Sequence, residues 1–348
     1  MDIKTVMKHY LPKIEEELRI FLDKEIINAS FVDARAKQII QQIKEYSLRP
    51  GKRIRPILII FGYKAFNGNN ENEIIKASIS IELIHSFLLI HDDIMDDDDL
   101  RRGLPTLHKV YAKKYRNDKI GESIAIIAGD IAFSFGNKAI LQTNFSSKNK
   151  FNAMNKLHEA ILNTGFGQLL DIDSEMKKDV NENDINKIHE LKTAQYTIEA
   201  PLHIGALLAG ASDDELRILS KYAIPLGRAF QIQDDILGMF GSEKKLGKPI
   251  GSDIKEGKRT LLITEALKKA SPEENKFLNT CLGNHEVTEE EIEKVRTIIK
   301  KSGSLEYSQK LAASLILQAK AALSKSNFEK EAKEFLNSIA DYMLKREK

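Results

Sequence analysis

Six aspartates lie within eight positions of HDDIMDDDDL (91–100), directly after a long apolar run. If that run is helical, Asp92 and Asp96 are four residues apart and project from one face. Leu88 and His85 lie on the same side, one and two turns earlier. Like charges at this spacing repel, and the negative end of the helix dipole opposes them further, so we expect a compensating cation. Closely spaced carboxylates suit Mg²⁺, which keeps several waters and is commonly shared with substrate phosphates.

A second acidic pair, Asp234 and Asp235, follows another apolar run in LGRAFQIQDDILGMFG (226–241). Gln231 stands one turn earlier. A buried aspartate paired with an arginine would explain one such motif. Two motifs of the same design, each at the end of an apolar helical run, fit that explanation less well.

Basic side chains lie beside these motifs and in two loops: Lys52, Arg53 and Arg55 in GKRIRP, Arg101 and Arg102 in LRRG, Lys192 in ELKTAQ, and Lys248 and Lys258 in the loop 241–258. Arginine matches phosphate oxygens with two donors, and lysine acts as a point charge. A single lysine is usually a solvated surface residue, but arginines next to carboxylates can cancel their charge and also hold an anion bridged by metal ions. Carboxylates, Mg²⁺ and cations around one cavity predict a diphosphate site, and we expect two. The sequence has no GxxxxGK[ST] segment, which excludes a P-loop nucleotide site.

The elements that position these residues read as helices, because apolar residues recur at spacings of three and four almost everywhere and no segment alternates strictly. We therefore predict an all-α fold. The expected helices cover 2–27, 31–47, 52–66, 71–96, 107–116, 122–143, 148–177, 182–209, 213–240, 259–268, 273–281, 289–302, 305–325 and 328–346. Capping-box spacings support three of the starts, at Ser212, Ser271 and Thr288. The sequence has no Pro/Ser-rich linker or short repeat, so we expect one domain over residues 1–348.

Composition narrows the classes of function. The 348 residues carry a net charge of +2, which favours neither nucleic acid nor an anionic membrane surface. The single cysteine excludes an internal disulfide and a cysteine-based metal cluster. The charged N-terminus does not resemble a signal peptide, and the apolar stretch 79–90 is short for a membrane span. We expect a soluble, cytoplasmic protein with no stable membrane insertion.

The motifs resemble those of the trans-isoprenyl diphosphate synthases, the polyprenyl synthetase family. The matching segments are GKRIRP, ELIHSFLLIHDDIMDDDDLRRG, GFGQLLDI, LKTAQ, GRAFQIQDDILG and LGKPIGSDIKEGKRT. The resemblance covers most of the chain and is greatest to archaeal-type short-chain members. It implies a helical bundle around a deep central cavity, assembled as a homodimer, and a head-to-tail condensation of isopentenyl diphosphate with dimethylallyl, geranyl or farnesyl diphosphate.

The resemblance also implies roles for individual residues. Asp92, Asp96 and Asp234 match the Mg²⁺ ligands, supported by Asp93 and Asp235, with about three ions per active site. The residues that match the isopentenyl diphosphate site are Lys52, Arg55, His85 and Arg102. Those that match the allylic diphosphate site are Arg101, Lys192, Thr193, Gln231, Lys248 and Lys258, and Lys192 is counted among the catalytic residues as well.

The implied reaction forms an allylic cation as the diphosphate leaves. The isopentenyl double bond attacks this cation, and the departed diphosphate takes the released proton. Metal ions and basic side chains stabilise the developing negative charge, and Thr193 and Gln231 present dipoles to the cation. One position departs from the family pattern, because Gly238 stands where the second motif often has a third aspartate.

Product length depends on residues that precede Asp92 on its helix, since the growing chain runs toward the helix N-terminus. Ile84, Phe87 and Leu88 lie one to two turns earlier, and Phe87 is bulky enough to act as a stop. Similar archaeal-type patterns give geranylgeranyl diphosphate, so we expect this product, with farnesyl diphosphate as the alternative. These three residues would look the same in the sequence if they only packed the core.

Three other functions remain open. A terpene cyclase shares the metal and diphosphate chemistry but needs no second diphosphate site. A catalytically silent subunit could bind diphosphates and regulate an active partner, although such subunits usually lose aspartates from the first motif. A helical scaffold protein would leave both acidic motifs unexplained.

Overall fold

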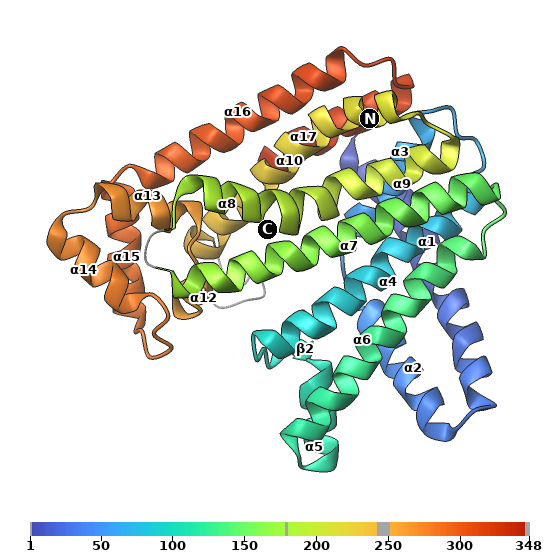
Figure 1. Cartoon of the computed structure of the whole chain (residues 1–348), viewed down its shortest axis with the longest axis horizontal. Helices are drawn as coiled ribbons and strands as arrows, with labels where there is room; N and C mark the ends of the chain where they lie inside the picture. The colour runs from blue at the N-terminus through green and yellow to red at the C-terminus, as the bar shows by residue number, and fades with distance from the viewer. Residues whose placement is uncertain (1, 178–179, 242–250, 345–348) are drawn as a thin grey trace. The chain divides into compact units, whose positions relative to one another are not determined.

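The computed structural model describes residues 2–177, 180–241 and 251–344, and most of them are helical (Figure 1). The prediction of an all-α fold is therefore confirmed. By its internal contacts the chain divides into two compact units. Unit 1 comprises Met1–Leu157 and Pro201–Ala211, and unit 2 comprises His158–Ala200 and Ser212–Lys348. The expectation of a single domain over residues 1–348 stays a prediction.

Unit 1 contains the first acidic motif at the end of α4. Its elements are α1 (Ile3–Ser30), α2 (Ala34–Ser47), α3 (Ile54–Lys64), α4 (Glu71–Met95), β1 (Leu100–Arg101), β2 (Leu104–Pro105), α5 (Leu107–Tyr115), α6 (Asp118–Leu141), the start of α7 (Ser147–Met176) and most of α9 (Ala200–Ala209). Helices α4 and α6 lie side by side over much of their length (Figure 1).

Two glycines of α6 allow this close packing. A Cβ atom on Gly136 would lie 2.7 Å from Ile84 Cδ1, and one on Gly129 would lie 2.3 Å from His91 Nε2. Both distances are shorter than van der Waals contact, so larger residues would force the helices or these side chains apart. The two glycines thus set the position of the last three turns of α4, which carry the aspartates.

Unit 2 contains the second acidic motif near the end of α10. Its elements are the rest of α7, α8 (Glu182–Ile188), η1 (His189–Glu199), α10 (Asp213–Phe240), α12 (Ser252–Lys255), α13 (Leu261–Lys269), α14 (Pro272–Cys281), α15 (Glu289–Lys301), α16 (Ser304–Ser324) and α17 (Lys330–Leu344). Helix α10 packs against η1 and α16. The buried Tyr222 of α10 donates its hydroxyl to the Leu336 carbonyl of α17, 2.7 Å away.

The predicted helix starts follow local capping chemistry. Ser212, Ser271 and Thr288 each begin a helix, and their N–H groups donate to Glu215, Glu274 and Glu291 at 2.8, 3.0 and 2.9 Å. All three capping boxes are confirmed.

Three features depart from the predicted elements. The expected helix 182–209 is α-helical at its ends, but His189–Glu199 winds as a π-helix. Residues 100–105 form a short antiparallel hairpin inside an expected loop, and α12 interrupts the loop expected at 241–258. The hairpin is too short to show alternation, and the apolar spacing of a helix does not distinguish π-winding from α-winding.

Helices α4 and α6 are long and apolar enough to cross a membrane by length and composition alone. The most apolar window of α4 is 67% buried inside the protein, and that of α6 is 44% buried. Burial of most of the α4 window is typical of a core helix, whereas more than half of the α6 window is not buried.

Candidate functional site

The aspartates of the first acidic motif have different surroundings. Asp92 and Asp96 close the last turn of α4, where Asp96 is the C-cap residue. The side chain of Asp92 is 28% exposed and lies 3.6 Å from Arg101 Nη2. Asp97 and Asp99 share one cation, since both pair with Lys109 of α5, at 2.8 and 3.1 Å.

Asp93, in contrast, is fully buried between two donors. Its carboxylate accepts the Tyr46 hydroxyl at 2.6 Å and the Arg101 guanidinium at 2.5 Å. Burial raises the pKa of Asp93, and Arg101 and Tyr46 act against that rise. Burial would lower the pKa of Arg101, but Asp93 and Asp92 outweigh it and raise that pKa. Arg101 is thus a fixed cation beside the aspartates, in the place where a compensating cation was expected.

A β-hairpin aims Arg101 at the aspartates. Arg101 pairs with Leu104 across the hairpin, and Arg102 and Gly103 between them have φ angles of 56° and 77°. A two-residue type I′ turn requires positive φ at both positions, which explains the glycine of the RRG segment. The buried Arg49 fastens the hairpin to the end of α2, because it donates to the carbonyls of Arg101 and Pro105 at 3.2 and 2.8 Å.

The four residues predicted to hold isopentenyl diphosphate all belong to unit 1. Arg55 Nη1 lies 3.3 Å from His85 Nε2, and Arg102 donates to the Arg49 carbonyl at 3.0 Å. Lys52 is half-buried in the segment before α3. The structure therefore brings Arg55, His85 and Arg102 into one electrostatic cluster.

His85 is held neutral in this cluster. Burial is the largest cause of a pKa far below the ordinary value, and Arg55, Arg102 and other arginines add to the shift. A neutral imidazole both donates and accepts, so it can bind an anion without adding charge.

Arg53, between Lys52 and Arg55, has a structural role. Its side chain is fully buried and pairs with Glu82, which is also buried. A buried ion pair of this kind fixes the start of α3.

The second acidic motif lies in unit 2, in a chain of polar contacts. The buried Thr193 donates its hydroxyl to the Gln231 carbonyl oxygen at 2.6 Å, and Gln231 donates its amide to Asp235 at 2.8 Å. His189 Nε2 lies 3.3 Å from the other Asp235 oxygen. These contacts connect Gln231 and Asp235. Asp234 is the less buried carboxylate of the motif.

Lys192 projects from the π-helix toward α7. Its ammonium lies 2.6 Å from the Asp171 carboxylate. Lys258, in the loop after α12, pairs with Glu256. Both lysines thus already have carboxylate partners in the folded chain. Lys248 lies outside the described residues.

Asp253 is a residue that the sequence argument missed. A Cβ on Gly238 would lie 3.1 Å from Asp253 Oδ2, so this carboxylate stands against the position where the family pattern often has a third aspartate. Burial, followed by repulsion from Asp235, raises the pKa of Asp253 to about 7. Asp253 therefore places a carboxylate beside Gly238.

The residues present suit divalent metal ions. No three His, Cys, Asp or Glu side chains gather tightly enough to hold a metal by themselves within residues 2–177, 180–241 and 251–344. Mg²⁺ is usually held by one or two carboxylates and completed by water and substrate phosphates. Asp92 and Asp96 in unit 1 and Asp234 in unit 2 fit such open sites, and the repulsion that raises the pKa of Asp253 would be relieved by a cation.

The three residues predicted to set product length have different surroundings. Ile84 is completely buried, whereas Phe87 and Leu88 are half-buried. The ring of Phe87 contacts Phe133 of α6 and His91 of α4, with centroid separations of 5.4 and 4.9 Å.

The comparisons with known proteins agree with these geometries. The model of the family "Polyprenyl synthetase" matches residues 37–299. A short chain isoprenyl diphosphate synthase of Methanocaldococcus jannaschii is 36% identical over 97% of this chain and 95% of its own length. The chain belongs to the polyprenyl synthetase family.

Other relatives differ in the product that they are named for. The geranylgeranyl diphosphate synthase of Saccharolobus solfataricus is 35% identical over 96% of this chain and 99% of its own. A geranylfarnesyl diphosphate synthase of Aeropyrum pernix is 36% identical over 86% of this chain and 91% of its own. As a member of this family the chain is a prenyltransferase, and that prediction is confirmed.

Solved structures share the fold over the whole chain. A geranylgeranyl pyrophosphate synthase from Corynebacterium glutamicum, complexed with isoprenyl diphosphate and magnesium, has a TM-score of 0.92 at 30% identity and covers 99% of this chain and 100% of its own. A polyprenyl synthase from Caulobacter crescentus, complexed with calcium and isoprenyl diphosphate, has a TM-score of 0.80 at 28% identity, covering 98% of each chain. These complexes support divalent metal dependence and small-molecule diphosphate substrates in this family. The predicted helical-bundle fold of the isoprenoid synthases is confirmed.

Proposed function

We propose that this chain condenses isopentenyl diphosphate with dimethylallyl, geranyl and farnesyl diphosphates to give geranylgeranyl diphosphate. The observation that carries the proposal is the arrangement at the end of α4. Asp92 adjoins the fixed cation Arg101 there. Arg101 in turn belongs to the cation cluster of Arg55, His85 and Arg102 in the same unit. Unit 2 carries the second acidic motif, around Asp234.

Each residue contributes by binding or positioning. Asp92, Asp96 and Asp234 would hold about three Mg²⁺ ions, which neutralise the leaving diphosphate when bound. Arg101, Lys192 and Lys258 would hold the allylic diphosphate by charge, and Lys248 is proposed with them. Lys52, Arg55, His85 and Arg102 would hold isopentenyl diphosphate.

The chain's own dipoles would then face the allylic cation. The Thr193 hydroxyl and the Gln231 amide are locked in one chain of hydrogen bonds, so their orientation is set before substrate binds. Such preorganised groups stabilise charge without reorganising during the reaction. Asp93 and Asp235 act one step further away, because they hold Arg101 and Gln231.

We also propose a cytoplasmic homodimer with no stable membrane insertion and no nucleic acid partner. Exposed apolar side chains on α6 support an association surface, since Ile120, Ile127 and Leu141 are 42, 53 and 57% exposed. Light scattering after size-exclusion chromatography measures this assembly. A monomer at micromolar concentration would contradict it.

An assay of the purified protein tests the reaction. It contains labelled isopentenyl diphosphate, Mg²⁺ and each allylic diphosphate in turn. We expect incorporation without any partner protein and a twenty-carbon main product. Absence of incorporation with release of a cyclic hydrocarbon would identify a terpene cyclase. Incorporation that appears only after addition of a second chain would identify a regulatory subunit, and a fifteen-carbon product would identify a farnesyl diphosphate synthase.

A further inference from the structure

The turn between α1 and α2 exposes apolar side chains. Phe31 is 85% exposed and Val32 is 79% exposed, and Ile27 in the last turn of α1 is 59% exposed. A single exposed apolar residue is common on protein surfaces, but neighbouring ones at the end of a helical hairpin indicate contact with another molecule. The condensation proposed above gives these residues no role.

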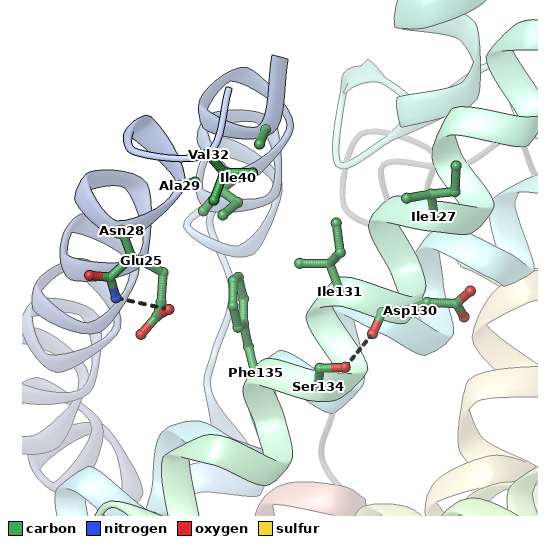
Figure 2. Close-up of a pocket in the computed structure, with 11 residues that line it drawn as sticks. Glu25, Asn28, Ala29, Val32, Ile40, Ile127, Asp130, Ile131, Ser134 and Phe135 are labelled. Atoms are coloured by element: carbon green, nitrogen blue, oxygen red, sulfur yellow. Dashed lines mark hydrogen bonds between the residues drawn. The ribbon is translucent and has the colours of Figure 1, made fainter. Parts of the chain in front are cut away.

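A pocket separates this turn from α6. The pocket has a volume of about 510 Å³ and lies between the α1–α2 hairpin and α6. Figure 2 shows Val32 and Ile40 on one side of it and Ile131 of α6 on the other. Glu25, a buried carboxylate of the lining, is paired with Lys138 of α6 at 2.8 Å. The pocket therefore continues the apolar surface of the turn inward, and Val32 stays exposed.

The end of α5 lies beside the start of α2. Lys114 donates to Gln38 of α2 at 2.8 Å, which links the two helices. The Lys114 ammonium also lies over the stacked rings of Tyr111 and Tyr115, and Tyr115 is 45% exposed. Tyrosines with one exposed edge are typical of membrane–water interfaces. In Figure 1 the α1–α2 turn and the end of α5 lie on the same side of unit 1, along its lower edge.

This side of unit 1 is also basic. Residues 31–38 and 111–116 contain one acidic side chain and five basic ones, and all six are exposed. The basic side chains are Arg35, Lys37, Lys113, Lys114 and Arg116. The acidic one, Asp33, pairs with Arg35 at 2.9 Å, and further acidic side chains follow on α6 at Asp118, Glu122 and Asp130. The two segments carry a net charge of +4, against +2 for the whole chain, so the whole-chain value hides a local positive surface.

We propose that residues 31–38 and 111–116, here called the tip surface, dock on an anionic membrane. Phe31 and Val32 enter the outer part of the bilayer, while Lys113, Lys114 and Arg116 contact anionic headgroups. The contact is peripheral and reversible because no helix enters the bilayer, so it agrees with the absence of stable insertion proposed above. The apolar turn favours a membrane over a nucleic acid, since a phosphate backbone binds cations and offers no apolar phase.

Flotation of the full chain with lipid vesicles tests the proposal. Vesicles of equal parts phosphatidylcholine and phosphatidylglycerol should bind the wild-type protein at least about tenfold more tightly than vesicles of phosphatidylcholine alone. Binding should weaken as salt is raised from about 0.1 M to about 1 M, because the Debye length shortens from about 10 Å to about 3 Å. Wild-type protein that binds neither kind of vesicle overturns the proposal.

Two double variants separate the apolar contribution from the charged one. F31S/V32S should weaken binding to the anionic vesicles by about tenfold or more, since the apolar contact is lost. K113Q/K114Q should weaken it by about 30-fold, because two cations near the headgroups are removed. Circular dichroism establishes that each variant is folded, and the exposure of all four side chains predicts that it is.

Matched controls change the same residue types on unit 2. Leu317 of α16 is 68% exposed, and Lys325 and Lys330 lie at the end of α16 and the start of α17. L317S and K325Q/K330Q should bind vesicles as the wild type does. The proposal is overturned if these controls lose as much binding as the tip-surface variants, or if both tip-surface variants bind as tightly as the wild type.

Two other results would assign the tip surface to a different partner and so overturn the proposal. A lower molar mass of F31S/V32S in light scattering would identify the turn as an association surface between copies of the chain. Binding to a DNA duplex that K113Q/K114Q removes and F31S/V32S retains would identify a nucleic-acid site. The vesicle measurement does not use turnover, so failure of the proposed condensation would leave it unaffected.

Discussion

Replacement of Asp93 by alanine should destabilise the protein strongly, whereas replacement of its neighbour Asp92 should remove activity with little loss of stability. Asp93 is fully buried and accepts from Tyr46 and Arg101. D93A leaves a buried guanidinium without its main partner, which costs about 3–5 kcal/mol. In a cooperative unit of this size each kcal/mol lowers Tm by about 2–4 °C, so we expect a decrease of about 6–20 °C.

Asp92 has a more exposed side chain at 3.6 Å from Arg101, and it lies in the same turn of α4. D92A should lower the free energy of unfolding by only about 1 kcal/mol, because partly exposed ion pairs contribute little. It should lower kcat by about 100-fold or more, since a charge that stabilises the leaving diphosphate is lost. The two variants thus form a matched pair that separates structural from catalytic carboxylates.

Thermal unfolding by circular dichroism, with labelled isopentenyl diphosphate turnover below the lower Tm, measures both effects. The reasoning is refuted if D92A unfolds at a much lower temperature than D93A, or if D93A retains the wild-type Tm. The conservative D93N tests the charge separately. It keeps the volume and one acceptor, so its Tm should lie between those of D93A and the wild type.

Three further predictions follow from individual contacts. G129A should destabilise the protein by about 1–3 kcal/mol because its methyl group displaces His91, and a urea unfolding curve unchanged from wild type would contradict the proposed close packing. The depressed pKa of His85 stabilises the fold above the ordinary histidine pKa of about 6.5, and this contribution is lost as the pH falls toward the folded-state pKa. The wild type should therefore lose more stability than H85Q between about pH 7 and 5, and parallel curves of unfolding free energy against pH would argue against a neutral buried imidazole. Removal of divalent ions with a chelator should abolish turnover and leave the helical circular dichroism intact, with recovery on addition of Mg²⁺; turnover that survives chelation would exclude the proposed metal chemistry.

Much of the fold could be predicted because helical periodicity and capping are local properties. Ser271 and Glu274, for example, specify a helix start without reference to the rest of the chain. The same holds for the opposed charges of Asp92 and Arg101, which are close in the sequence. The π-helix from His189 to Glu199 could not be predicted in this way, since apolar spacing predicts a helix without distinguishing π-winding from α-winding.

The missing parts of the candidate site share one cause. Asp253 and Gly238 meet where α12 packs against α10, and Phe133 and Phe87 meet where α6 packs against α4. Neither pair has a signal in the linear sequence beyond its residue types. Tyr46, which holds Asp93, was missed for the same reason, although a tyrosine on an apolar helical face is a reasonable candidate for a buried donor.

Both ends of the π-helix His189–Glu199 are held by contacts with α10, which limits changes in its length. Its first residue, His189, contacts Asp235, and its last, Glu199, accepts the Ser220 hydroxyl at 2.6 Å. Deleting one residue between these anchors while the rest of the segment kept its winding would rotate one anchor relative to the other by roughly a quarter of a turn. A substitution within the segment leaves unchanged the rotation about the helix axis between His189 and Glu199. An insertion or deletion changes that rotation. The number of residues between His189 and Glu199, as well as their identity, therefore fixes how the two ends of the segment face their partners on α10.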